Sequence, residues 1–267
     1  MSISTILSRQ TPAVSSHKAA TLVLLFLVAT GHLSCMRKPA RDAQPTASAS
    51  PTEQEAIDKI LNRYEQALGG KAAIDSLKTY RLKGTFEIAG LTGTLENWRK
   101  EPEKTLTVME FPGLGTLRKG FDGQTRWVQT PVGSVVDSSP QQIGQLERDS
   151  EVYVAGTIKR LFDTMKLENK ARLSGRDMYV VEGKPARGPA EKLFFDVENG
   201  LLVRWDMARR EANRTVFVRV HLTDYKDVSG VKVPFNVRLA FESFTCIIKV
   251  EELEPNITID DAIFRKP

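Results

Sequence analysis

Cysteine and histidine, which serve widely as nucleophiles, bases and zinc ligands, are scarce in this chain, which has two cysteines and three histidines among 267 residues. Two cysteines cannot build a disulfide framework or a four-thiolate zinc site. His221 shares one face of an expected strand with Arg219 and Thr223, opposite an apolar set, so we interpret it as a surface residue and not as a catalytic base. No Gly-x-Ser-x-Gly motif, which would hold an activated serine on a sharp turn, occurs in the chain. The sequence therefore predicts no enzyme, no metal site and no cofactor.

The sequence predicts different roles for Cys246 and Cys35. Cys246 is in phase with Phe244, Ile248 and Val250 of an expected strand, which is typical of a buried, unreactive thiol. Cys35 instead stands at the end of an apolar segment near the N-terminus. Its chemistry therefore depends on what that segment is.

The segment before Cys35 is typical of a signal peptide. Arg9 and Lys18 precede the apolar run Ala19–Thr30, whose twelve residues span roughly 18 Å as a helix, short of a bilayer core of about 30 Å. A small residue directly before Cys35 resembles a bacterial lipobox, although His32 stands where an aliphatic residue is usual. Cleavage would leave Cys35 as a lipidated N-terminus carrying acyl chains such as palmitate. Ordinary cleavage, or an uncleaved anchor, is the alternative.

Composition divides the chain into three parts: a signal peptide at 1–35, a tether at 36–51 and a folded domain at 52–267. The tether is rich in Ala, Ser, Pro and Thr and has no aromatic residue, so it cannot bury enough apolar surface to order itself. The net charge of +5 is spread along the chain, which predicts no nucleic-acid binding. We expect a monomer that a lipid anchor holds on a membrane of the bacterial cell envelope, facing the periplasm, with the outer membrane favoured over the inner.

The expected elements begin with a helix. Thr52 and Glu55 form a capping box, and Gly69 and Gly70 end the helix. Its apolar residues recur on one face at helical spacing: Ile57, Ile60, Leu61, Tyr64 and Leu68. Shorter helical segments are expected over Lys71–Leu77, from Ser139 to about Val154, and over Thr157–Phe162.

Most of the remaining sequence predicts strands, because apolar and polar residues alternate between turn signals. We expect strands over Tyr80–Ile88, Thr94–Arg99, Thr105–Phe111, Thr116–Phe121, Thr125–Gln129, Lys166–Leu173, Met178–Gly183, Lys192–Asp196, Leu201–Met207, Thr215–Tyr225, Val231–Phe241 and Thr245–Leu253. The fold class is therefore α+β, with one strongly curved antiparallel sheet of eleven to twelve strands and helices over its concave face. Strands with one apolar and one polar face enclose an interior that is either filled or open to an apolar ligand.

Four motifs also point to a known family. They are Phe121-Asp122-Gly123-x-x-x-Trp127, Phe195-Asp196-x-x-x-Gly200-Leu201-Leu202, Tyr225-Lys226-Asp227-x-x-Gly230-Val231-x-x-Pro234-Phe235 and Asn256-x-x-Ile259-x-x-x-x-Phe264-x-x-Pro267. With Pro102 at the end of an early strand, their order and spacing resemble the LolA/LolB superfamily of periplasmic lipoprotein carriers and receptors. The similarity covers roughly residues 52–267 and is greatest to the bacterial proteins called outer membrane lipoprotein-sorting proteins.

The resemblance implies an incomplete β-barrel whose hydrophobic concave face, lidded by helices, holds the acyl chains of a lipoprotein or another lipid, without enzyme activity. The carriers place an arginine, tied to lid closure and cargo release, just before this proline. Here that position is Glu101, with Arg99 and Lys100 upstream. A lipid-anchored body also looks more like the receptor of such a system.

Five residues are candidate lining of the acyl cavity: Tyr80, Leu82, Phe86, Ile88 and Trp127. The alternatives are a plain core for the first four and an indole filling a barrel end for Trp127. Gly84 leaves space on the same face, which favours a cleft or a strongly bent strand.

The favoured function is lipid or lipoprotein acyl-chain binding, in lipoprotein sorting or in lipid transport to the outer membrane. A structural envelope lipoprotein with a filled core is the main alternative, and an enzyme on the same scaffold is a weaker one. A transmembrane barrel is disfavoured, because the polar strand faces carry Arg, Lys and Glu.

Overall fold

The computed structural model describes residues 50–133, 135–137, 158–186, 188–211 and 214–267. The expected signal peptide with Cys35, nearly all of the tether, and the helix expected from Ser139 to about Val154 lie outside these residues.

Helix α2 (Pro51–Ala67) begins before the expected capping box. Ser50 is its N-cap and its hydroxyl accepts a hydrogen bond from the backbone N–H of Glu53, with Pro51 in the first turn. Serine at the cap and proline directly after it are the preferred start of a helix, so the predicted start at Thr52 was late and Pro51 belongs to the helix. The expected apolar face is confirmed, since Ile57, Ile60, Leu61, Tyr64 and Leu68 are all buried. A short helix α3 (Gly70–Ser76) follows.

The described residues form a single sheet of fourteen strands, in which every pairing between neighbours is antiparallel. The strands are β1 (Thr79–Ile88), β2 (Leu91–Lys100), β3 (Lys104–Phe111), β4 (Gly115–Phe121), β5 (Arg126–Gln129), β6 (Val135–Asp137), β7 (Thr164–Leu167), β8 (Ala171–Leu173), β9 (Arg176–Lys184), β10 (Glu191–Asp196), β11 (Leu202–Glu211), β12 (Arg214–Val228), β13 (Val231–Ala240) and β14 (Thr245–Pro255). Two 3₁₀ turns, η1 (Ile158–Leu161) and η2 (Asp261–Phe264), complete the elements. The α+β class with one antiparallel sheet is therefore confirmed.

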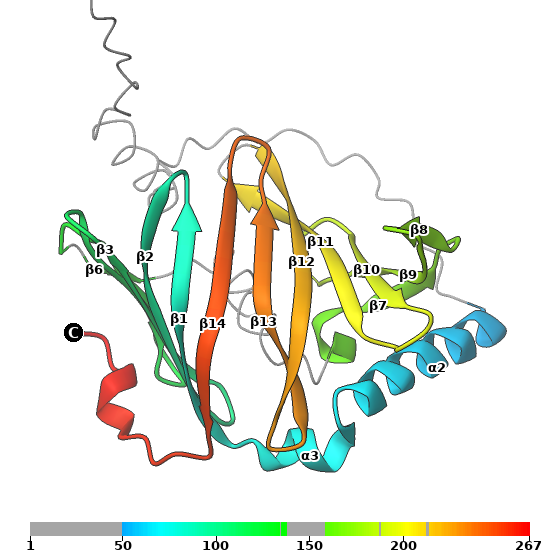
Figure 1. The fold of residues 1–267 in the computed structure, drawn as a ribbon, viewed down its shortest axis with the longest axis horizontal. Helices are drawn as coiled ribbons and strands as arrows, with labels where there is room; N and C mark the ends of the chain where they lie inside the picture. The colour runs from blue at the N-terminus through cyan, green and yellow to red at the C-terminus, as the bar shows by residue number, and fades with distance from the viewer. Residues whose placement is uncertain (1–49, 134, 138–157, 187, 212–213) are drawn as a thin grey trace, which may run out of the picture.

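The strand order runs β6-β5-β4-β3-β2-β1-β14-β13-β12-β11-β10-β9-β7, and β8 pairs with β9. The first and the last strand of the domain, β1 and β14, thus pair at the centre, with one wing on each side (Figure 1). No pairing joins β6 to β7 within the described residues, so the sheet stays open, as an incomplete barrel requires.

Two details raise the strand number above the expected eleven to twelve. The three-residue strand β6 was too short to produce a pattern of alternation. The expected strand Lys166–Leu173 is two strands, β7 and β8, which pair with different parts of β9. The polar sequence Glu168-Asn169-Lys170 lies between them, outside both ladders.

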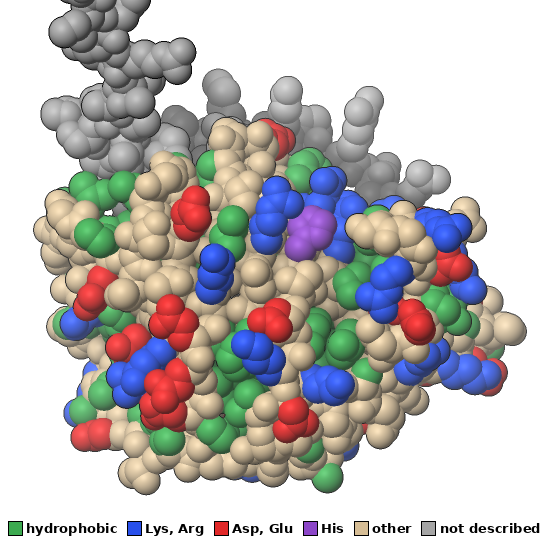
Figure 2. All heavy atoms as spheres, viewed as in Figure 1, with side chains coloured by type: hydrophobic (Ala, Val, Ile, Leu, Met, Phe, Trp, Pro, Cys, Tyr) green, Lys and Arg blue, Asp and Glu red, His purple; other side chains and the backbone are tan. Residues whose placement is uncertain are grey.

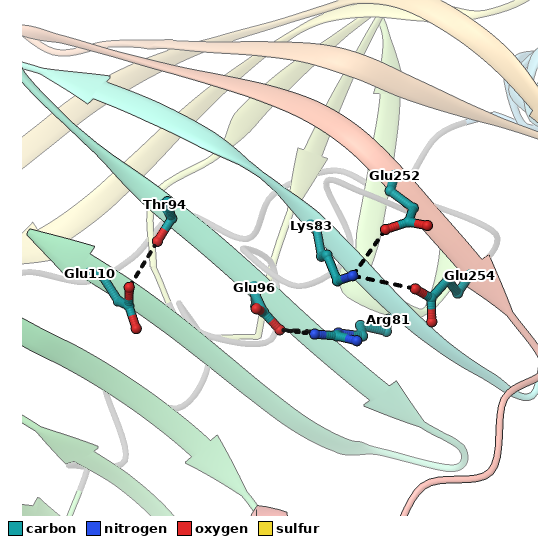
Figure 3. A network of polar contacts seen from close by, with 7 residues as sticks. All are labelled: Arg81, Lys83, Thr94, Glu96, Glu110, Glu252 and Glu254. Atoms are coloured by element: carbon teal, nitrogen blue, oxygen red, sulfur yellow. Dashed lines mark hydrogen bonds and ion pairs between the residues drawn. The ribbon is translucent and has the colours of Figure 1, made fainter.

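The sheet has an inner face that is mostly apolar and an outer face that is mostly polar. One cluster of buried residues joins Leu117 of β4, Leu82 of β1 and Trp205 of β11, which are far apart in the strand order, so the sheet curves around it. The outer face of β1 carries Arg81 and Lys83, which form ion pairs with Glu96 and Glu252 (Figure 3). Charged side chains of both signs cover this outer side (Figure 2).

The described helices cover only part of the inner face. Tyr64 of α2 packs on Phe195 of β10, with ring centroids 5.3 Å apart, and the carboxylate of Glu53 accepts a hydrogen bond from the backbone N–H of Leu167 in β7. Helix α2 therefore lies beside the β7–β10 wing, and α3 lies near the β12–β13 turn (Figure 1). That helices lid the concave face stays a prediction, and the helix expected from Ser139 lies outside the described residues.

Candidate functional site

The inner face of β1–β5 is defined by direct cross-strand partners. One row contains Tyr80, Arg99, Thr105, Phe121 and Arg126, and the next contains Leu82, Asn97, Thr107, Lys119 and Val128. A third row contains Gly84, Leu95, Met109 and Leu117. Phe86 and Ile88 continue the same face of β1, because side chains in a strand alternate. Polar and apolar residues therefore occupy opposite ends of this inner face.

The apolar end is built around two aromatic rings. Phe86 of β1 and Phe111 of β3 have centroids 4.7 Å apart at an interplanar angle of 58°, a favourable tilted arrangement. Gly93 leaves the space that the Phe86 ring occupies, because a Cβ at that position would lie 2.4 Å from Phe86 Cζ. Leu95 and Leu117 extend the buried apolar surface across β2 and β4.

The polar end carries three cations, Arg99, Lys119 and Arg126, all of them half-buried. The Arg126 guanidinium lies 3.6 Å from the centroid of the Phe121 ring. Asn97 is buried and its side-chain amide donates a hydrogen bond to the Thr107 hydroxyl at 2.8 Å. This end of the face therefore carries charged and polar groups beside its aromatic rings.

Cys246 lies on the inner face of the sheet, opposite Ile88 of β1. Cys246 is buried on β14, and its burial raises the pKa of the thiol to about 11, an effect that the positive charge of Lys119 partly opposes. The expected burial of Cys246 is confirmed, and the raised pKa of its thiol agrees with the expected low reactivity.

Four of the five predicted lining residues lie together. Tyr80, Leu82, Phe86 and Ile88 share the inner face of β1 and belong to the main buried cluster, with exposed fractions of 6% or less. That they line an open acyl cavity stays a prediction.

Trp127 does not lie with these four residues. By register it is opposite Gly120, and Gly120 is opposite Leu106, on the outer face. There Trp127 is buried with Ile259 and Phe264 from the C-terminal segment, and its indole N–H donates to the Phe264 carbonyl at 2.9 Å. Sequence alternation could not show this placement, because the segment that covers Trp127 lies more than 130 residues further along the chain.

The prediction that Gly84 leaves open space was wrong. A Cβ at Gly84 would lie 2.2 Å from the backbone oxygen of Lys249. The register between β1 and β14 shifts at Lys83 and Gly84, so the glycine permits a bulge where two backbones approach closely. The alternative of a bent strand matches this geometry.

His221 lies on the outer face, level with Arg204 of β11 and Arg238 of β13. Partial burial lowers the pKa of its imidazole, and the neighbouring arginines lower it further. Figure 2 shows the histidine among Lys and Arg side chains. Within the part of the chain that the structure describes, no three His, Cys, Asp or Glu side chains are grouped to hold a metal ion.

The cations of the inner face are the residues that sequence reasoning missed. Lys119 shares the strand face of Leu117 and Phe121, which indicates that it could point inward, but a single lysine in a strand is more often exposed. Only the cross-strand register brings Arg99, Lys119 and Arg126 to the same end of one face.

A cleft of about 260 Å³ opens beside α2, between this helix and β7. Leu61, Phe162 and Met165 line it and also contact the main core. The ammonium of Lys159 and the carboxylate of Asp58, 2.7 Å apart, form an ion pair at this cleft.

The described helices include none with the length and apolar character needed to cross a bilayer.

No family model matches the sequence, and no curated protein matches it. Solved structures do match. A DUF1329 family protein from Desulfovibrio piger has a TM-score of 0.55 at 16% identity, over 80% of this chain and 97% of that one. A LolA superfamily protein from Nitrosomonas europaea has a TM-score of 0.54 at 13% identity, over 78% and 97%. A Vibrio parahaemolyticus domain named for outer membrane lipoprotein sorting has a TM-score of 0.52 at 11% identity, over 78% of this chain and 97% of that one. The chain therefore has a LolA-like fold.

Proposed function

We propose that this chain is an envelope lipoprotein that binds lipid or lipoprotein acyl chains on the inner face of its sheet, in lipoprotein sorting or in lipid transport to the outer membrane. One observation carries the proposal: a contiguous apolar face around which the open sheet curves. Acyl chains gain hydrophobic free energy on such a surface, at roughly 25 cal/mol per Å² of apolar area removed from water. The role is binding and not catalysis, with the expected lipid on Cys35 as anchor.

Structural similarity supports this class of ligand. The Nitrosomonas protein is named for the LolA superfamily, and the Vibrio domain is named for lipoprotein sorting. The proposed lining is Tyr80, Leu82, Phe86 and Ile88, from which we remove Trp127 because of its place on the outer face.

A structural lipoprotein with a filled core is the second candidate, and burial favours it. Leu82 and Phe86 have exposed fractions of 0% and 1%, as core residues without a ligand would. The two candidates differ in whether this surface separates to admit an acyl chain.

Photolabelling distinguishes them at the level of single residues. We expect a fatty acid with a photoreactive group near its methyl end to label Met109 and Leu117, which lie on the inner face. Val108 and Arg118 are their direct neighbours on the outer face of the same strands, so they act as internal controls. Unlabelled fatty acid in excess should abolish the labelling.

Labelling only on the outer face, or labelling that excess fatty acid does not reduce, would contradict the proposal. It would leave the filled-core lipoprotein as the better description.

A further inference from the structure

The sheet has an edge beside β12, because β13 ends before β12 begins. The last pair between the two strands joins Arg219 of β12 to Ala240 of β13. β12 extends beyond this pair to its start at Arg214, and over that stretch its only neighbour among the described strands is β11. After Ala240 the chain turns into β14, since the backbone N–H of Phe241 donates to the Phe244 carbonyl at 2.9 Å. One side of β12 therefore lacks a neighbouring strand here.

We propose that this stretch, Thr215–Val218, which we call the β12 edge, binds an extended polypeptide segment of another protein by strand addition. The segment lies in the place that β13 leaves and carries apolar side chains at alternate positions. This inference goes beyond acyl-chain binding and does not depend on it.

The β12 edge offers backbone hydrogen bonds. Alternate residues of a strand direct their N–H and C=O groups to opposite sides, so half of these groups point away from β11. Within the described residues, no backbone hydrogen bond joins the β12 edge to a segment other than β11. Natural sheet edges are often blunted by proline or by charge, whereas this stretch is Thr-Val-Phe-Val, which strongly favours a strand. The edge is therefore a template for a further strand.

Side chains on both faces of the β12 edge are apolar. A groove of about 360 Å³ lies beside it, between Phe217 of β12 and Phe241 at the end of β13. Phe217 has an exposed fraction of 60%, and in the described part of the chain only Val132 is another large hydrophobic side chain with such exposure. Val216 and Val218 belong to the main buried cluster on the inner face. An added strand would meet apolar surface on either face, because its side chains alternate as those of β12 do.

The unpaired backbone groups favour a polypeptide over a bilayer as the occupant. If Phe217 inserted among lipid chains, the N–H and C=O groups of the β12 edge would lose water and gain no partner, which is strongly unfavourable in hydrocarbon. An added strand instead supplies the hydrogen bonds that these groups lack and covers the Phe217 ring at the same time.

Peptide selection tests the β12 edge directly. A phage-displayed library of random heptapeptides is selected on the immobilised full-length protein, and we expect enrichment of peptides with β-branched or aromatic residues at alternate positions. Synthetic copies should bind Phe217→Lys at least about tenfold more weakly than the wild type, because a charge on an edge opposes strand addition. Thr223→Lys should bind them as the wild type does. Thr223 is exposed on the same face of β12 but is paired with Asn236 of β13, which makes it the matched control.

Backbone methylation separates strand addition from ordinary apolar contact. N-methyl groups on alternate residues of a selected peptide remove the N–H donors of one side. Methylation of one alternating set should weaken binding at least about tenfold, and methylation of the other set should leave it unchanged, since one side of an added strand pairs with β12. Hydrogen exchange of the protein should slow within Thr215–Val218 when the peptide is bound.

Four results would overturn the inference. The first is a selection that yields no peptide with measurable affinity, and the second is a set of peptides that bind Phe217→Lys as well as the wild type or do not respond to methylation. The third is a dimer of the protein that Phe217→Lys abolishes, which would make a second copy the occupant. The fourth is binding to phosphatidylethanolamine–phosphatidylglycerol vesicles that Phe217→Ser abolishes while no peptide binds, which would make the surface a membrane contact. Melting temperatures show whether each variant is folded, and Phe217→Ser serves in the peptide assay if Phe217→Lys is not.

Discussion

At the scale of single residues, close approaches decide what each position tolerates. Gly84 allows β14 to pass within contact of β1, and Gly120 allows the Trp127 indole to lie flat on β4, since a Cβ there would be 2.3 Å from Trp127 Cε2. Neither glycine is needed for its own torsion angles, because neither has a positive φ. Gly84 is thus required by a contact between segments far apart in the sequence, and Gly120 by a contact between the consecutive strands β4 and β5.

Gly84→Leu should destabilise the fold rather than block a cavity. The added side chain would meet the Lys249 backbone, so overpacking is expected to cost at least about 2 kcal/mol. This lowers the melting temperature by roughly 4–8 °C for a domain of this size. Gly90→Asn is the control, because its space is open and asparagine tolerates its positive φ. An unchanged melting temperature for Gly84→Leu would show that the two backbones can separate at this bulge.

Cys35→Ala tests the proposed anchor. We expect metabolic labelling with a fatty acid to tag the wild-type chain, because the apolar segment before Cys35 ends like a lipobox. The variant should be unlabelled. Labelling that survives the substitution would show that the lipid is attached elsewhere.

At the scale of elements, periodicity predicted the strands well and their partners poorly. The alternation in β1, β12 and β13 predicted which residues are buried, because one face of each strand packs on the core. It could not predict that η2 covers the outer face of β3–β5, since a short irregular segment has no period. The start of α2 was missed because serine and proline, here Ser50 and Pro51, are as typical of the tether as they are of a helix start.

The stability that the C-terminal segment gains from the ion pairs of Asp261 should fall as the pH falls. Hydrogen bonds from Lys100 and Lys104 lower the pKa of the Asp261 carboxyl from 3.8 to about 2. Because the folded state holds this proton less tightly than the unfolded state, the stabilisation is complete above about pH 4 and is lost as the pH falls toward 2.

Asp261→Asn should therefore lower the melting temperature at neutral pH and have no effect near pH 2. Glu103→Gln, at an exposed carboxylate of the neighbouring turn, is the control for a loss of charge. A difference between Asp261→Asn and wild type that is independent of pH would contradict the assigned ion pairs.

At the scale of the whole molecule, the central pairing of β1 with β14 joins the two wings into one sheet. The first strand of the domain cannot complete its ladder until the last strand is in place. The sequence predicted one curved sheet, but the order of its strands depends on this long-range pairing, which turn motifs do not encode.

A chain that begins at Ser50 should therefore unfold in a single transition, seen alike by far-ultraviolet circular dichroism and tryptophan fluorescence. Fragments separated near residue 150 should not fold, because each would lack one of the two central strands. Two independent transitions would contradict the assignment of residues 52–267 to one domain.

The central claim is that the inner face holds an acyl-chain lipid. The most direct measurement is mass spectrometry of protein purified without detergent, in its native state and after extraction with organic solvent. We predict near-stoichiometric lipid in the native complex, and its release as an acyl-chain lipid on extraction. Protein that carries no lipid, and that takes up none when incubated with phosphatidylglycerol or fatty acid, would contradict the account and indicate a filled core.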